Sequence, residues 1–208
     1  MFKAKFVQFA RIYLFFCGRW CIIIHGMKTK ENRQEKLKTY LENLNIPSFV
    51  EKSSNLSWDI YFMKICKLVS TRSSCSHRKV GAVIVKENRI LATGYNQPPS
   101  GFPHCETIGC IRDGLKIQSG ENQEICFALH AEQNALMQAA KFGISTNGAT
   151  LYTTFKPCSI CARLIVNAGI KRVVYLYDYP DPLTDYFFKI CKVAIEKLSD
   201  EILLEVKP

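Results

Sequence analysis

The chain of 208 residues lacks, in its first 26 residues, an uncharged apolar run long enough to cross a membrane. This segment is apolar and contains no acidic side chain, but Arg11 and Arg19 interrupt every stretch of about eighteen residues, the usual minimum for a spanning helix. A convincing small-residue cleavage site is also missing. We therefore expect no stable membrane insertion. Two interpretations of residues 1–26 stay open: a start site assigned upstream of Met27, so that the segment is not translated, or an amphipathic or targeting extension.

Acidic residues are scarce in the first quarter of the chain. The net charge is +10, and residues 1–57 carry ten Lys and Arg against four Asp and Glu, whereas residues 58–208 carry eighteen against fourteen. Because the larger part is only mildly basic, it lacks the charge typical of a nucleic-acid-binding domain. We expect no nucleic acid polymer as a partner, and an anionic nucleotide fits the charge equally well.

Cysteine is abundant, with ten residues. A chain with this much predicted regular structure does not resemble a small disulfide scaffold, so we expect two or more of the thiols to bind metal. A reducing, cytoplasmic location follows from this interpretation.

Two short motifs combine residue types that bind zinc and move protons. His130 and Glu132 open one apolar-periodic segment, and Pro157, Cys158 and Cys161 open another after an intervening strand pattern. One imidazole and two thiolates leave the fourth position of a tetrahedral zinc site open, as in catalytic sites. Glu132 is placed to exchange protons beside the metal rather than to bind it. This combination is a signature of zinc deaminases.

With these motifs the chain resembles the cytidine deaminase-like superfamily and, within it, the deoxycytidylate (dCMP) deaminases, including the bacterial competence-type branch. The resemblance spans roughly residues 58–180. It rests on six segments: residues 80–85, 94–96, 99–105, 109–114, 130–135 and 157–162.

The resemblance implies zinc-dependent hydrolysis of dCMP to dUMP and ammonia, which supplies dUMP for thymidylate synthesis. It implies attack at C4 of the cytosine ring, with Glu132 protonating N3 and then carrying a proton to the departing ammonia. Ala131 then offers its backbone N–H to the base carbonyl. The family also implies a homo-oligomer, a hexamer by resemblance, and dCTP and dTTP as candidate effectors.

Residue periodicity predicts an extension at residues 1–57 and a deaminase domain at residues 58–208. In the extension we expect a charged helix at 28–44 and a linker at 45–57. In the domain we expect a buried first helix at 58–71, further helices at 132–141, 158–167 and 184–198, and strands at 80–85, 89–95, 150–154, 172–177 and 202–206. The order and the resemblance imply an α/β chain with a three-layer α/β/α cytidine deaminase-like fold and one mixed five-stranded sheet.

Three further residues are candidates for substrate binding. Asn96 matches the family position that contacts the sugar, although an Asn at a turn has a structural interpretation as well. Arg78 and Lys79 follow a hydroxyl-rich segment and supply cations suitable for a 5′-phosphate, but they could equally be solvated charges.

A long insertion at residues 97–129 separates this chain from shorter deaminases, and it is rich in metal-binding side chains. Some dCMP deaminases hold a second, structural zinc in this region. The resemblance implies a closed site formed by Cys75, Cys105, Cys110 and either His104 or Cys126, with free buried cysteines as the alternative.

The chain departs from the family pattern at three places. Gln97 replaces a frequent Gly in a region linked with regulation by dCTP and dTTP. Phe127 and Ala128 replace a frequent Arg-Gly pair, and His77 replaces a frequent Arg. Two alternatives therefore stay open beside dCMP deamination: a zinc deaminase for another cytosine or purine substrate, and a non-catalytic, zinc-stabilised competence-associated protein.

Overall fold

The computed structural model describes residues 30–43, 56–118 and 121–200, and the chain divides into two compact units, Met1–Ser54 and Asn55–Pro208. In the first unit, helix α3 (Lys30–Glu42) exposes its side chains at 35–40 to solvent, as its charged sequence predicts. Residues 1–26 and nearly all of the expected linker lie outside the described residues. Among the described residues, we find no helix with the length and apolarity needed to cross a bilayer.

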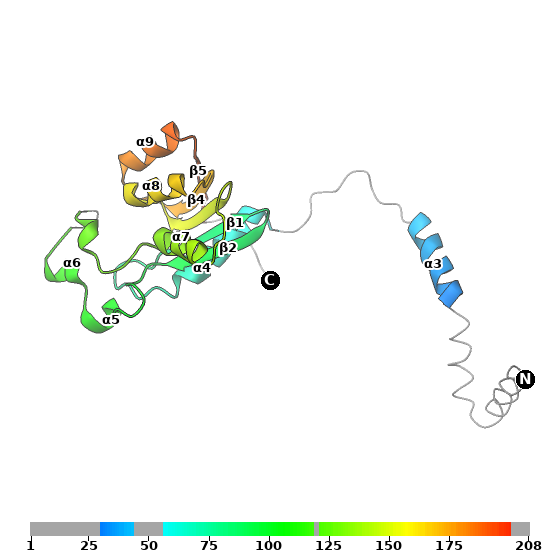
Figure 1. Cartoon of the computed structure of the whole chain (residues 1–208), viewed down its shortest axis with the longest axis horizontal. Coiled ribbons are helices and arrows are strands. Elements are labelled where there is room, and N and C mark those ends of the chain that lie inside the picture. Colours follow the sequence, from blue (N-terminus) through cyan, green and yellow to red (C-terminus); the bar gives the residue numbers. More distant parts are fainter. Residues whose placement is uncertain (1–29, 44–55, 119–120, 201–208) are drawn as a thin grey trace, which may run out of the picture. The chain divides into compact units, whose positions relative to one another are not determined.

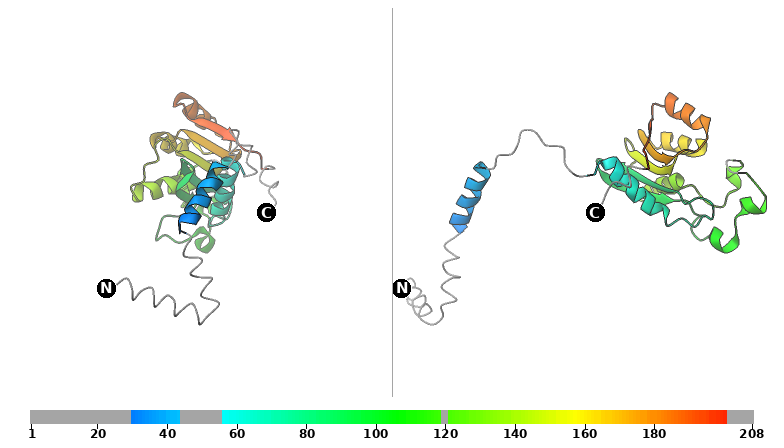
Figure 2. Two further views of the ribbon diagram at one scale, coloured as in Figure 1. Left: turned by 90° about the vertical axis from the view of Figure 1, so that its right-hand side faces the viewer. Right: turned by 180° about the vertical axis from the view of Figure 1, so that it is seen from behind.

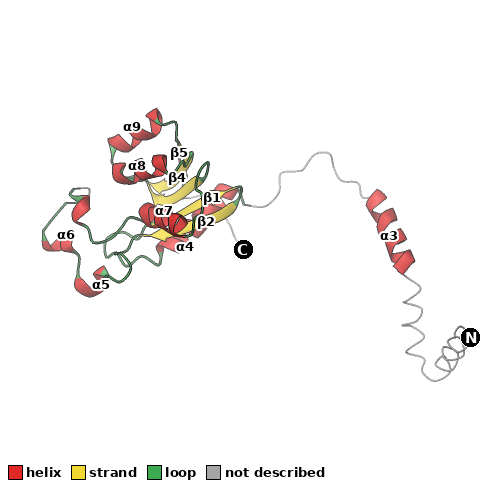
Figure 3. Cartoon of the chain, in the orientation of Figure 1, coloured by secondary structure: helices red, strands yellow, loops and turns green. Residues whose placement is uncertain are grey.

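The second unit is built on one mixed sheet of five strands (Figures 1 and 3). The strands are β1 (Gly81–Lys86), β2 (Arg89–Tyr95), β3 (Thr150–Phe155), β4 (Arg172–Tyr177) and β5 (Ala194–Lys197), in the order β2-β1-β3-β4-β5. β1 pairs antiparallel with β2 and β3, whereas β3, β4 and β5 run parallel. The β1–β2 turn consists of Glu87 and Asn88, both with positive φ, which suits the twist of a tight hairpin. The predicted mixed five-stranded sheet is confirmed.

Helices cover both faces of this sheet, which confirms the expected three layers. One face carries α4 (Trp58–Ser70), and the other carries α7 (Ala131–Lys141), α8 (Ser159–Asn167) and α9 (Pro182–Ile190). The right-hand view of Figure 2, turned by 180° from Figure 1, shows the face that carries α4. α4 buries one stripe, Phe62, Met63 and Cys66, against the sheet. The expectation of a buried first helix holds for that stripe alone, because Trp58 and Leu68 on its other face are 54% and 69% exposed.

The expected helix at 184–198 is wrong in its second half. α9 begins at Pro182, where the Asp181 carboxylate accepts the Leu183 N–H, and ends at Ile190. Lys192 then adopts a left-handed backbone conformation with φ of 56°, which stops the helix. The following residues form β5, which pairs in parallel with β4 and completes the sheet. The expected strand at 202–206 lies outside the described residues.

The insertion at residues 97–129 leaves the sheet after β2 and returns just before α7. A pair of backbone hydrogen bonds between Gln97 and Leu129 closes its base. Among the described residues of the insertion, the regular elements are α5 (Cys105–Ile108), α6 (Ile111–Gly114) and the 3₁₀ turn η1 (Gln123–Ile125).

Candidate active site and metal centre

Three side chains predicted to bind metal meet where α7 and α8 begin. His130 is the N-cap residue of α7, Cys158 is the N-cap residue of α8, and Cys161 lies one turn further along α8. The His130 Nδ1 atom is 3.4 Å from Cys158 Sγ and 3.3 Å from Cys161 Sγ. A tetrahedral zinc ion with ordinary bond lengths separates such nitrogen and sulfur ligands by about 3.6 Å. The three residues therefore fit a metal ion.

The electrostatics of this group also suit a metal. Hydrogen bonds from Cys161 and His130 lower the pKa of the Cys158 thiol to about 4, although burial opposes this change. Cys158 is therefore ready to act as a thiolate, the form of cysteine that binds metal.

Glu132 lies beside the three metal-binding side chains on the first turn of α7. Its side chain is buried, with 4% of the residue exposed, and burial raises the pKa of its carboxyl group above the ordinary value. The Thr153 hydroxyl on β3 donates a hydrogen bond of 3.5 Å to Glu132 Oε1. A buried carboxyl group with a raised pKa can hold a proton near neutral pH and release it again.

Close contact between β2 and α7 positions these groups. Gly94 of β2 faces the first turns of α7, and a Cβ atom placed on it would lie 2.2 Å from the Ala131 carbonyl oxygen and 2.3 Å from the Ala135 backbone nitrogen. Only glycine at this position allows α7 to approach the sheet this closely. At the N-terminus of α7, the His130 N–H also donates to Gln133 Oε1.

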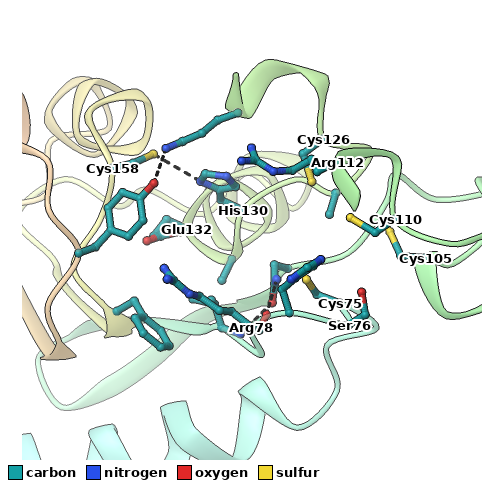
Figure 4. Close-up of a pocket in the computed structure, with 18 of the residues that line it drawn as sticks. Cys75, Ser76, Arg78, Cys105, Cys110, Arg112, Cys126, His130, Glu132 and Cys158 are labelled. Atoms are coloured by element: carbon teal, nitrogen blue, oxygen red, sulfur yellow. Dashed lines mark hydrogen bonds between the residues drawn. The ribbon is translucent and has the colours of Figure 1, made fainter. Parts of the chain in front are cut away.

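His130, Glu132 and Cys158 line a cavity of about 350 Å³ (Figure 4). Ala131 lines it and is fully buried. Arg78 lines it as well, with its guanidinium group 5.5 Å from the centre of the Phe155 ring and 5.7 Å from that of Tyr179. Lys79 is exposed and does not line the cavity, so the structure separates the two cations that the sequence suggested for phosphate binding.

Asn96 also lines the cavity, but its side chain makes three protein contacts. Its Oδ1 atom accepts hydrogen bonds from the Val80 N–H and the Ser73 hydroxyl, and its Nδ2 atom donates to the Arg78 carbonyl oxygen. Asn96 therefore holds the segment that carries Arg78 against the end of β2.

Four cysteines lie at the insertion side of the same cavity: Cys75, Cys105, Cys110 and Cys126 (Figure 4). They are close enough that the pKa of the Cys105 thiol, raised mainly by burial, is raised further by the other three. His104 does not line the cavity, and its Nδ1 atom lies 3.0 Å from the Ser74 hydroxyl. Among the described residues, groups of three metal-binding atoms within 4.8 Å occur only at His130, Cys158 and Cys161 and at a second trio, His77, Cys110 and Asp113.

The departures from the family pattern have local structural partners. Gln97 forms the bridge at the base of the insertion, the Phe127 ring packs 5.0 Å from that of Phe102, and Ala128 lines the cavity. His77 pairs with Asp113 on the surface. These contacts leave regulation by dCTP and dTTP a prediction.

Several residues that line the cavity received no role in the sequence analysis. They include Phe155, Lys156, Tyr179, Gln123 and Arg112. The first three lie at or just beyond the carboxyl ends of β3 and β4, where ligands bind in open sheets with parallel strands, so their position along the strands could have indicated them. Gln123 and Arg112 come from the insertion and have no such signal.

Comparison with known proteins supports a deaminase. The chain is 37% identical over 154 residues to the ComE operon protein 2 of Bacillus subtilis. This alignment covers 73% of this chain and 77% of that protein. It is 44% identical over 140 residues to the deoxycytidylate deaminase of Saccharomyces cerevisiae, covering 66% of this chain but only 43% of that enzyme. The chain thus spans less than half of the length of the yeast relative.

The structure is similar to that of the dCMP deaminase from cyanophage S-TIM5 in complex with dCMP and dUMP, with a TM-score of 0.58 and 37% sequence identity over 69% of this chain and 100% of that chain. Residues 56–206 match the profile of the MafB19-like deaminases. The chain therefore belongs to the MafB19-like deaminase family.

Proposed function

We propose that this chain catalyses the zinc-dependent hydrolysis of dCMP to dUMP and ammonia and so supplies dUMP for thymidylate synthesis. One observation carries the proposal: His130, Cys158 and Cys161 meet beside the buried Glu132, next to a cavity that Arg78 and Arg112 line. The similarity to deoxycytidylate deaminases and to a solved complex with dCMP and dUMP supports the choice of substrate.

The chemistry needs a nucleophilic water and a group that moves protons. When bound, zinc supplies the Lewis acidity that makes water nucleophilic near neutral pH. Glu132 accepts a proton from that water and passes it to N3 of the cytosine ring as the bond to C4 forms. It then takes the proton of the new C4 hydroxyl group and delivers it to the amino group, which leaves as ammonia as the C4 carbonyl forms. The raised pKa of the Glu132 carboxyl group suits both halves of this transfer. The Ala131 N–H is our candidate donor to the base carbonyl.

The monophosphate is our proposed substrate because the cavity contains fixed positive charge. Arg78 reaches the cavity between two aromatic rings, which orient its planar group. Asn96 holds the backbone at Arg78 and reaches the cavity itself, so contact with the sugar is compatible with its position.

We also propose that the second, structural zinc binds to Cys75, Cys105, Cys110 and Cys126. The four thiols lie at one side of the cavity, whereas His104 does not line it and contacts Ser74 through Nδ1. Four thiolates form a closed structural site, which would hold an insertion that has few buried residues of its own.

Self-association, which the family resemblance implies, is a further part of the proposal. α9 exposes Leu183, Tyr186 and Ile190 at helical spacing, with 49%, 61% and 61% of each residue exposed. An apolar stripe of this kind is typical of protein interfaces. Light scattering of the purified chain tests it: a monomer at all concentrations contradicts the proposal.

The activity is tested by incubating the purified full chain with dCMP, deoxycytidine and cytidine separately, while measuring ammonia release and zinc per chain. Ammonia from dCMP in large preference to the nucleosides supports the proposal. Zinc-loaded protein that releases ammonia from none of them overturns it and leaves the two alternatives, a deaminase of another cytosine or purine substrate and a non-catalytic protein.

A further inference from the structure

The insertion places a second guanidinium group, that of Arg112, in the catalytic cavity. Arg112 belongs to the four-residue helix α6, and Figure 4 shows it beside His130 and Cys126, whereas Arg78 enters from the segment before β1. The two arginines therefore reach one cavity from parts of the chain far apart in sequence.

Hydrogen bonds to two backbone carbonyl groups orient the Arg112 side chain. Its Nη2 atom donates to the Gln118 carbonyl oxygen at 2.5 Å, and its Nη1 atom donates to the Asn122 carbonyl oxygen at 3.4 Å. Both acceptors are neutral, and no carboxylate of the described residues forms an ion pair with Arg112. The charge is thus oriented but not neutralised, as an anion-binding site requires.

Arg112 and Arg78 converge on Tyr179. Arg78 lies over the Tyr179 ring, while the Tyr179 hydroxyl accepts a hydrogen bond of 2.6 Å from Gln123, the residue after the Asn122 that holds Arg112. Burial is the main cause that raises the pKa of the Tyr179 phenol, and the charges of Arg78 and Arg112 both act against it. Both positive charges therefore act on the same point of the cavity wall.

We propose that Arg112 is a specificity-determining residue that, together with Arg78, binds the 5′-phosphate of the nucleotide substrate. The inference rests on the proposed function. A guanidinium group matches the planar spacing of two phosphate oxygens, and two such groups distinguish a dianionic monophosphate from an uncharged nucleoside. The insertion then recognises substrate in addition to stabilising the fold.

The test compares the full wild-type chain with Arg112→Met and Arg112→Lys, using kcat/KM for dCMP and for deoxycytidine. Loss of a charge-assisted hydrogen bond predicts that Arg112→Met lowers the value for dCMP by about 10- to 100-fold. The value for deoxycytidine should stay within about twofold, because the nucleoside has no phosphate to lose. Arg112→Lys should fall between, since it keeps the charge but loses the planar group.

Arg163→Met is the matched control. Arg163 is exposed on α8 and also donates to a backbone carbonyl oxygen, that of Ser159, but it does not line the cavity. This variant should keep the wild-type preference for dCMP. Equal losses for dCMP and deoxycytidine in Arg112→Met, or no loss for dCMP, overturn the proposal.

Product binding separates this inference from the proposed activity, because it requires no turnover. Calorimetry of zinc-loaded protein should show that Arg112→Met weakens binding of dUMP by about 10- to 100-fold while binding of deoxyuridine is unchanged. That result, in a wild-type chain that releases no ammonia from dCMP, would refute the deaminase activity and retain the phosphate-binding role. Unchanged binding of dUMP would refute the role of Arg112 itself.

Discussion

The two sides of the catalytic cavity are built in different ways. His130, Glu132, Cys158 and Cys161 lie at the beginnings of α7 and α8, and these helices pack on the sheet through a continuous buried cluster. The insertion carries Cys105 and Arg112 on helices of four residues, Cys110 just before α6 and Cys126 just after η1, and Cys105 is the buried residue of the two helices. Hydrophobic packing holds the first side, whereas we propose that metal–thiolate bonds hold the second.

The difference teaches where rigidity comes from in this molecule. A side chain at a helix start inherits its position from the whole helix and from the core below it. A side chain in a long loop needs another constraint, because short helices bury too little apolar surface to order the backbone. Substitutions on the sheet side should therefore remove activity or unfold the protein, and those in the insertion should have smaller effects.

The largest effect is expected from Glu132→Ala. Removing the group that transfers protons should lower kcat by about 10³- to 10⁴-fold, near the upper end of general acid–base effects. Zinc content should stay unchanged because Glu132 is not a metal-binding residue in our proposal. Ammonia release and elemental analysis measure both quantities. Glu106→Ala, an exposed glutamate of α5 in the insertion, is the control and should keep wild-type activity.

Replacing one thiol on each side compares the two proposed metal sites. Cys161→Ser should abolish measurable turnover with loss of the catalytic zinc. Cys110→Ser should lose the structural zinc, lower the melting temperature and retain activity reduced by about tenfold, in line with effects of groups that support a metal site. Zinc per chain, melting temperature and kcat/KM are the measurements. If Cys110→Ser keeps the zinc content of the wild type, the second zinc site is wrong.

Replacing a glycine by alanine should have opposite effects on the free energy of unfolding on the sheet side and on the insertion side of the cavity. Gly94→Ala forces a methyl group against the α7 backbone and should destabilise the protein by about 3 kcal/mol, the range of severe overpacking. Gly114→Ala meets no atom within 4 Å at the end of α6 and should stabilise by about 0.5 kcal/mol, by restricting the unfolded chain. Urea unfolding measures both changes. Equal destabilisation would show that the insertion is packed as tightly as the sheet side.

The smallest effect concerns an ion-pair network that ties α4 to the sheet. The Asp59 carboxylate accepts two hydrogen bonds from Arg172 and one from the Tyr152 hydroxyl. The bond from Arg172 is the main cause that lowers the pKa of Asp59 below its ordinary value of 3.8. Asp59 therefore stabilises the fold above about pH 4, and this contribution is lost as the pH falls through the lowered pKa.

Asp59→Asn should lower the free energy of unfolding by about 1 kcal/mol at pH 7, since the pair is partly exposed. The difference from the wild type should shrink as the pH falls below 4, between the ordinary pKa of the unfolded-state carboxyl group and the lowered pKa of Asp59 in the folded protein. Unfolding curves between pH 3 and pH 7 test this, and a difference independent of pH would assign the effect to packing.

Local patterns predicted the elements that form the sheet side. β2 and β4 have the predicted bounds, and α7 and α8 begin within one residue of the predicted starts. Alternating and helical apolar spacing carry this information because each segment buries one face. β5 was missed because an edge strand of four mostly exposed residues has no strong pattern, and its pairing with β4 creates it.

The sequence by itself determined the family, the three layers and the set of residues that meet at the proposed metal centre. Their spacing along two helices brings His130, Cys158 and Cys161 together in any fold that packs both helix starts on one sheet edge. Only the tertiary structure decided that Arg78 but not Lys79 reaches the cavity, and that Arg112 joins it from the insertion. The direction of a loop side chain depends on contacts with distant segments, and local sequence does not encode those contacts.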